Sequence, residues 1–215
     1  MAKTVTGKFQ GKIDSHLAGI KEIIASEAVF YPAEKFQERL QSQQSHPHLI
    51  LSSNGYRMCR INSAIKKEYA KNGIEGLTRR FAAQSLSDST ETIYFTDNGN
   101  NRINTTFKQA GYNFESKKYE ICHIGKDTTH SVETFGAIPN LVYLPRWIAS
   151  ASDHSDEIIE FLLKKSYSLY SSIMKKYMPD FDVNNFFLLL CNKNEVLFNS
   201  IQNDEDVKKY HWQNV

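Results

Sequence analysis

The sequence predicts an α+β protein with a mainly helical N-terminal half and a C-terminal half in which two strands precede helices. Apolar residues recur at helical spacing through much of residues 1–84, whereas two β-prone runs flank a polar loop between residues 119 and 145. The chain has 215 residues, of which 40% are hydrophobic and 23% charged, enough for one large domain or two small ones. We therefore expect a helical, basic region over residues 1–84 and a second region over residues 92–215.

The composition argues against a membrane partner. The mean hydropathy is −0.49, and no apolar run approaches the ~20 residues of a spanning helix. The N-terminal residues lack the apolar core of a signal peptide, so we expect a cytoplasmic protein. The cysteines Cys59, Cys122 and Cys191 are widely spaced, which argues against a disulfide framework or a four-thiolate zinc site.

The first third of the chain has the pattern of helices. Apolar residues over 17–24 fall on one helical face, and Pro32 is suited to the first position of a second helix over 32–41. After a polar break, residues 59–81 again have helical spacing, interrupted at Asn72 and Gly73. Two short helices around a turn containing glycine have the outline of a helix-turn-helix.

Basic residues gather in this last segment. Seven lie between residues 57 and 80, against the acidic residues Glu68 and Glu75, although the net charge of the whole chain is only +2. A local excess of this kind can neutralise phosphates, which supplies most of the sequence-independent affinity for DNA. A solvated helical surface is the alternative interpretation. The basic residues are Arg57, Arg60, Lys66, Lys67, Lys71, Arg79 and Arg80, and all but Lys71 are our candidates for DNA contact.

Three further elements are expected in the middle and at the end of the chain. Residues 93–96 form a β-prone run, and residues 97–101 have the composition of a hairpin turn. Residues 158–177 have the periodicity of a long amphipathic helix that ends before Pro179. Residues 186–191 are apolar and suit either a strand or a helix.

The segment over residues 117–154 carries the side chains best suited to chemistry. A β-prone run ends at His123, a polar loop follows, and Asn140 directly precedes a second β-prone run. Pro145 then introduces a helical pattern, so the order is strand, loop, strand and helix. Histidine titrates near neutral pH and can therefore activate a water molecule as a general base.

This order resembles that of the HNH or ββα-metal endonuclease family, through His123 in EICHI, Asn140 in IPNLVYLP and His154 in SDH. The resemblance covers residues 117–154 and implies a ββα-metal nuclease core in the C-terminal half. It implies His123 as the general base, Asn140 as the organiser of the loop, and a divalent metal: Mg²⁺ first, with Mn²⁺, Ni²⁺ or Zn²⁺ as alternatives. Double-stranded DNA is the implied substrate, as in restriction or phage-defence enzymes, and cutting of both strands allows a homodimer.

The metal ligands are less clear than the base. Cys122 stands where the family often has an acidic ligand, and it suits either a soft metal or a buried apolar position. Asp153 and His154 are our other candidate ligands, although residues 152–156 also have the pattern of a helix N-cap. Arg146 is our further candidate for phosphate contact, with a surface salt bridge as the alternative.

Other functions have weaker signals. The sequence has no GxGxxG, GxxxxGK[ST], HExxH or GxSxG motif, so dinucleotide-binding, P-loop, zincin and α/β-hydrolase functions lack their signatures. If His123 is a structural histidine and Asn140 a turn residue, the alternative function is a non-catalytic DNA-binding regulator that uses the basic helices over 57–81. A protein-interaction module without a nucleic-acid partner is the third hypothesis.

Overall fold

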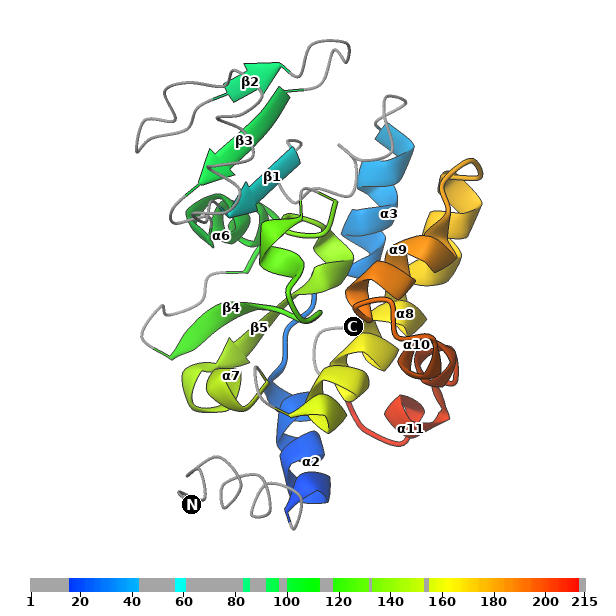
Figure 1. The fold of residues 1–215 in the computed structure, drawn as a ribbon. Helices are drawn as coiled ribbons and strands as arrows, with labels where there is room; N and C mark the ends of the chain where they lie inside the picture. The colour runs from blue at the N-terminus through cyan, green and yellow to red at the C-terminus, as the bar shows by residue number, and fades with distance from the viewer. Residues whose placement is uncertain are drawn as a thin grey trace, which may run out of the picture.

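The long helix α8 (Asp156–Tyr177) is the element against which helices from both halves of the chain pack (Figure 1). The computed structural model describes residues 16–42, 57–60, 83–85, 92–96, 100–112, 118–131, 133–152 and 155–212. Over these residues the protein combines strands with a larger share of helix, which confirms the expected α+β class.

Local sequence explains where α8 begins and ends. The Ser155 hydroxyl accepts a hydrogen bond from the third amide of the helix, and Asp156 and Glu157 occupy the first turn, where negative charge is favourable. Two lysines stand in the last turn, and the helix stops at Tyr177, shortly before a proline. The helix predicted over 158–177 is therefore confirmed, with Ser155 as its N-cap.

Two N-terminal helices pack against the C-terminal half. They are α2 (Leu17–Glu27) and α3 (Ala33–Ser42), and both were expected from the sequence. The fully buried Tyr170 of α8 donates its hydroxyl hydrogen to the Tyr31 carbonyl at 2.6 Å. Its ring meets that of Phe36 edge-on, with the centroids 5.0 Å apart. These contacts attach α3 and the segment before it to α8.

An antiparallel hairpin followed by a helix lies beside α8. The hairpin consists of β4 (Tyr119–His123) and β5 (Leu141–Pro145), and α7 (Arg146–Ser152) follows directly. His123 pairs with Leu141 at one end of the ladder. Every residue of β5 is buried. The predicted order of strand, loop, strand and helix is confirmed.

Two other segments cover the hairpin. Val29, between α2 and α3, pairs with Tyr143 of β5 through backbone hydrogen bonds of 2.9 and 3.0 Å. Helix α6 (Asn100–Gln109) contacts β4 and sets the Phe107 ring edge-on to the Tyr143 ring, with the centroids 4.9 Å apart. Residues that precede the hairpin in the sequence thereby cover part of it.

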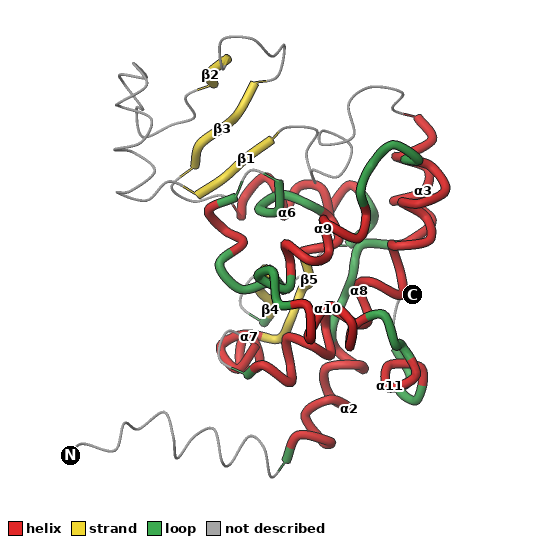
Figure 2. Tube along the Cα trace, turned by 45° about the vertical axis from the view of Figure 1, so that its right-hand side comes forward, coloured by secondary structure: helices red, strands yellow, loops and turns green. Residues whose placement is uncertain are grey.

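A separate three-stranded sheet lies at one end of the molecule (Figure 2). Its strands are β1 (Arg57–Arg60), β2 (Ala83–Ser85) and β3 (Thr92–Thr96), in the order β1-β3-β2. Strand β1 runs parallel to β3, and β2 runs antiparallel to it. The strand predicted over 93–96 is confirmed, and the sheet joins residues from both of the predicted regions.

The prediction of helices over residues 59–81 is wrong at Cys59, and the mainly helical region predicted over 1–84 also ends in a strand. Cys59 lies in β1, and residues 83 and 84 lie in β2, while residues 61–82 lie outside the described residues. Both short strands pair with β3, which is distant in sequence from β1 and close to β2, so backbone hydrogen bonds between strands override the local helical spacing.

The prediction of a hairpin turn over 97–101 is also wrong, because α6 already begins at Asn100. Ile103 and Phe107 stand four residues apart and are both fully buried. This spacing places them on one face of a helix, and burial of that face decides the conformation of a segment whose polar residues also suit a turn.

Three short helices complete the C-terminal part. They are α9 (Val183–Leu190), α10 (Glu195–Ile201) and α11 (Glu205–Lys208), so most of the apolar run over 186–191 is helical. Side chains of Asp182 and Asn194 cap α9 and α10. Among the described residues, none of the helices combines the length and the apolar character that crossing a bilayer requires.

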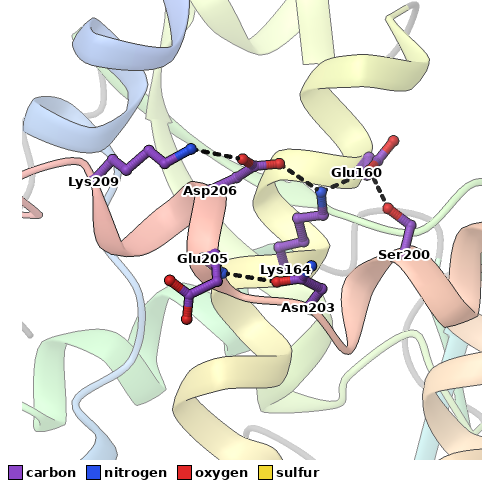
Figure 3. Close-up of polar contacts among 7 residues, drawn as sticks. All are labelled: Glu160, Lys164, Ser200, Asn203, Glu205, Asp206 and Lys209. Atoms are coloured by element: carbon purple, nitrogen blue, oxygen red, sulfur yellow. Dashed lines mark hydrogen bonds and ion pairs between the residues drawn. The ribbon is translucent and has the colours of Figure 1, made fainter.

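A cluster of charged side chains holds these helices on α8 (Figure 3). Lys164 Nζ lies 2.9 Å from Glu160 Oε1 and 3.0 Å from Asp206 Oδ2 of α11, and the Lys164 side chain is 10% exposed. The Ser200 hydroxyl of α10 donates to Glu160. Burial lowers the pKa of Lys164, but hydrogen bonds to the two carboxylates outweigh that effect and raise it. Lys164 therefore stays charged and links α8 to α11.

Replacing Lys164 with methionine should weaken the attachment of α11 to α8, while the methionine side chain keeps the apolar part of the lysine. We expect a loss of about 1–2 kcal/mol of unfolding free energy, because Glu160 loses the cation that compensates its partial burial. The amides of residues 205–210 should exchange faster with deuterium. Lys209→Met is the control, since Lys209 is 71% exposed and reaches Asp206 at 3.4 Å. Equal exchange in the two variants would contradict the role of Lys164.

The same cluster predicts a dependence on acid. The hydrogen bond from Lys164 lowers the pKa of Asp206, and bonds from Ser200 and Lys164 lower that of Glu160 despite its burial. Both carboxylates thus stabilise the fold at any pH above about 4, the pKa of these groups in the unfolded chain. That contribution is lost as the pH falls through their lower pKa values in the folded protein. The protection of amides 205–210 against deuterium exchange, measured relative to the intrinsic rate at each pH, should fall below about pH 4 in the wild type and depend less on pH in Lys164→Met.

Candidate functional site

The loop between β4 and β5, residues 124–140, is held by one buried side chain. Asn140 is fully buried, and its Oδ1 accepts a hydrogen bond from the Gly125 amide at 2.9 Å. Its Nδ2 donates to the Thr128 hydroxyl and to the Thr134 carbonyl, both at 2.9 Å. The side chain therefore links the beginning, the middle and the later part of the loop.

Two threonines extend this network. The Thr128 hydroxyl donates to the Gly125 carbonyl at 2.7 Å, and the Thr134 hydroxyl donates to the Thr128 carbonyl at 2.9 Å. Both donor hydrogens and the oxygen of the Asn140 amide have partners, so its burial does not leave a polar group unsatisfied. This geometry suits the loop-organising role expected for Asn140, while a part in catalysis stays a prediction.

Close packing against α9 and α8 fixes the side of the loop that faces these helices. A Cβ at Gly125 would lie 2.6 Å from the Leu190 carbonyl oxygen, so the backbone there approaches α9 more closely than a side chain allows. The Ser166 hydroxyl of α8 donates to the Pro139 carbonyl. Lys126 at the start of the loop forms an ion pair with the first turn of α8. The loop path is thus set by the helices behind it.

His123 ends β4 with its imidazole ring held in one orientation. Its Nε2 lies 3.0 Å from the Phe135 carbonyl oxygen, which only accepts hydrogen bonds, so Nε2 carries the hydrogen. In the neutral ring the lone pair is then on Nδ1. The ring stacks on that of the fully buried Phe135, with the centroids 4.8 Å apart and an interplanar angle of 23°. His123 is partly exposed, and a histidine held in one orientation at the end of a strand suits the role of a general base.

The strand that begins the basic segment lies beside this loop. Strand β1 contacts the short helix η1 (Thr128–His130) within the loop (Figure 1). Arg57 and Arg60 are the first and last residues of β1, so two of the predicted DNA-contacting positions belong to an element next to the loop. The other four of that segment lie outside the described residues: Lys66, Lys67, Arg79 and Arg80.

Arg146 lies at the other end of the hairpin from His123. It follows β5 beyond the pair formed by Tyr119 and Pro145, and four residue steps of an extended strand separate Tyr119 from His123 by about 13 Å. Arg146 Nε lies 4.0 Å from Glu120 Oε2, and both side chains are exposed. The structure therefore does not bring Arg146 together with His123, and its position matches a weak surface salt bridge.

Cys122 packs in the hydrophobic core. It is 8% exposed, and its thiol lies 3.9 Å from the Glu120 carbonyl oxygen. Asp153 and His154 lie outside the described residues. In the part of the chain that the structure describes, no three His, Cys, Asp or Glu side chains come together as metal ligands would. The described residues do not form a complete divalent-metal site, and we assign no chemical step to a metal.

Sequence reasoning missed the residues that hold His123 and Asn140. Phe135 is an aromatic residue in an otherwise polar loop, and this pattern indicates a loop that packs against the protein. Thr128 and Thr134 carry no comparable signal, because hydroxyl side chains are ordinary in polar loops. Gly125 follows β4 as a common turn glycine does, and only its distance from α9 distinguishes it.

Comparisons of the chain with protein-family models, with curated proteins and with solved structures found no match. The loop held by Asn140 and the oriented His123 are therefore the grounds for a functional proposal.

Substitution of Asn140 should destabilise the loop and the protein. In Asn140→Ala the buried Gly125 amide loses its acceptor and the Thr134 carbonyl keeps only the Ala137 amide as a donor, so we expect a loss of about 2–4 kcal/mol of unfolding free energy in urea denaturation. Asn140→Asp should lose a similar amount, because a carboxylate oxygen would face the Thr134 carbonyl. The exposed Asn185 of α9 is the control, and Asn185→Ala should change stability by less than about 0.5 kcal/mol. An equally small effect at Asn140 would show that the network does not hold the loop.

Proposed function

We propose that the protein is a metal-dependent endonuclease of HNH type that hydrolyses phosphodiester bonds in double-stranded DNA, with restriction or phage defence as its context. The observation that carries the proposal is the hairpin with its loop. His123 ends the first strand, Asn140 precedes the second and holds the loop between them, and α7 follows. This arrangement supports the resemblance to ββα-metal nucleases suggested by the sequence.

His123 is the proposed general base. Its Nδ1 takes a proton from a water molecule while the water oxygen attacks phosphorus, and the leaving oxygen takes a proton from solvent. The Phe135 carbonyl accepts from Nε2 before and after this transfer, so it keeps the ring in the required tautomer and stabilises the imidazolium that forms. Stacking on the Phe135 ring limits rotation of the imidazole.

A divalent metal, Mg²⁺ first with Mn²⁺, Ni²⁺ or Zn²⁺ as alternatives, would neutralise charge on the phosphate when bound. Of the expected ligands, Cys122 lies in the core, and Asp153 and His154 lie outside the described residues. Metal dependence therefore rests on the family resemblance, and removal of the metal is the direct test of it.

The basic segment over 57–80 is the proposed DNA-contacting surface. Its first strand, β1, lies beside the loop that also holds His123, so DNA bound by this segment would pass close to the candidate base. Phosphate contacts of this kind weaken steeply with added salt. A homodimer would present two such sites and allow both strands to be cut.

Cleavage of plasmid DNA tests the proposal. We expect wild-type protein to cut plasmid in the presence of Mg²⁺, Mn²⁺, Ni²⁺ or Zn²⁺ and to stop when EDTA is added. His123→Ala should cut at least ~100-fold more slowly, since general-base catalysis typically contributes that much. His211→Ala is the matched control, because His211 is an exposed histidine near the C-terminal end, and it should cut at the wild-type rate.

The outcomes separate the hypotheses. Cutting by His123→Ala at the wild-type rate would remove His123 as the base. A gel shift of DNA that is left uncut with every metal would assign a non-catalytic DNA-binding regulator instead. Binding that is weak and insensitive to salt would favour a protein-interaction module. Degradation of RNA alone would keep the chemistry and change the substrate.

A further inference from the structure

A hollow of about 540 Å³ lies at the end of the hairpin away from His123. It is formed by α2, the segment that enters β4, and the beginning of α7. Its lining includes three aromatic or apolar side chains and three charged ones: Ile23, Tyr119, Trp147, Glu27, Lys118 and Arg146. The hollow is distinct from the candidate active site but shares the same rigid pair of strands.

The hollow leaves large apolar surface in water. Trp147 is 65% exposed and Ile23 is 37% exposed. Within the described part of the chain, Val196 is the one further large hydrophobic side chain that is similarly exposed. Burial of an indole ring is strongly favourable, so an exposed tryptophan in a concave site indicates a surface that something else covers.

Two exposed cations at the hollow could contact an anion. Arg146 and Lys118 are exposed, and Arg146 forms only a long, solvent-exposed ion pair with Glu120, with 4.0 Å between Nε and the nearest carboxylate oxygen. The lining carboxylate, Glu27, accepts a hydrogen bond from the Tyr119 hydroxyl, and this bond raises the pKa of Tyr119 to about 12. Two cations thus flank an exposed indole, and each of the two carboxylates nearby already has a partner: Glu27 accepts from Tyr119, and Glu120 pairs weakly with Arg146.

We propose that this hollow binds an unpaired nucleotide of single-stranded nucleic acid, with its base stacked on Trp147 and its phosphate held by Arg146 and Lys118. Every base can stack on an indole, and a guanidinium can grip a phosphate with two hydrogen bonds. The choice of nucleic acid over an acidic protein partner rests on the proposed function.

The hairpin sets how far this nucleotide lies from the candidate base. Tyr119 and His123 stand about 13 Å apart along β4. At the duplex rise of about 3.4 Å per nucleotide that distance corresponds to about four nucleotides, and to fewer in an extended single strand. The hollow would therefore hold a strand that is opened or frayed a few positions from the phosphate facing His123.

Tryptophan fluorescence provides the test, because the chain has two tryptophans and Trp212 is largely packed against Phe161. In a Trp212→Phe background the emission reports Trp147 alone. We expect an oligo-dT strand, added in EDTA so that nothing is cut, to quench this emission with an affinity that falls as salt is raised. A blunt duplex of equal length should quench less, because its bases are paired.

Substitutions separate stacking from charge. Trp147→Ala should weaken binding of labelled oligo-dT about tenfold, measured by anisotropy with Trp212 intact, whereas Trp147→Phe should keep most of the affinity. Arg146→Ala should lower the slope of affinity against salt by about one. Val196→Ala is the control for an exposed apolar side chain elsewhere and should bind as the wild type does.

The inference fails if oligo-dT leaves Trp147 emission unchanged at low salt, or if Trp147→Ala binds as tightly as the wild type. A shift in emission that depends on protein concentration and not on oligo-dT would assign the hollow to a second copy of the chain and overturn the inference. Cleavage of plasmid without quenching would refute this site alone. Quenching without cleavage would refute the nuclease alone.

Discussion

The buried amide of Asn140 is the interaction on which the candidate site depends. A side-chain amide removed from water is costly unless its donors and acceptor are paired. The loop must therefore follow a path that brings Gly125, Thr128 and Thr134 to this one side chain. The same path delivers the Phe135 carbonyl to His123. The orientation of the proposed base is thus a consequence of how the loop closes.

Helix α8 helps to fix the path of the loop, because it contacts both the loop and the N-terminal part of the chain. Ser166 donates to the Pro139 carbonyl on the loop side, and Tyr170 donates to the Tyr31 carbonyl on the other. Both side chains are fully buried. Polar groups that are satisfied inside a core fix one arrangement of the surrounding elements, so the helix positions the hairpin as well as covering it.

The hairpin also places the two proposed sites at its opposite ends. One end carries His123 and lies near β1, and the other carries the aromatic hollow around Trp147. The two ends are held at a set distance by the strand register, which a nucleic acid strand would have to match. A net charge of +2 therefore conceals a local group of basic residues at 57–80.

The sequence by itself determined α2, α3, α8 and the order of β4, loop, β5 and α7, because periodicity, caps and prolines act between near neighbours. It also placed His123 at the end of a strand. Only the tertiary structure decided that residues 57–60 pair with β3 and that the segment from Asn100 is helical, since each depends on burial or pairing with distant residues. The tautomer of His123 was likewise decided only by the tertiary structure, because the carbonyl that sets it belongs to Phe135, across the loop.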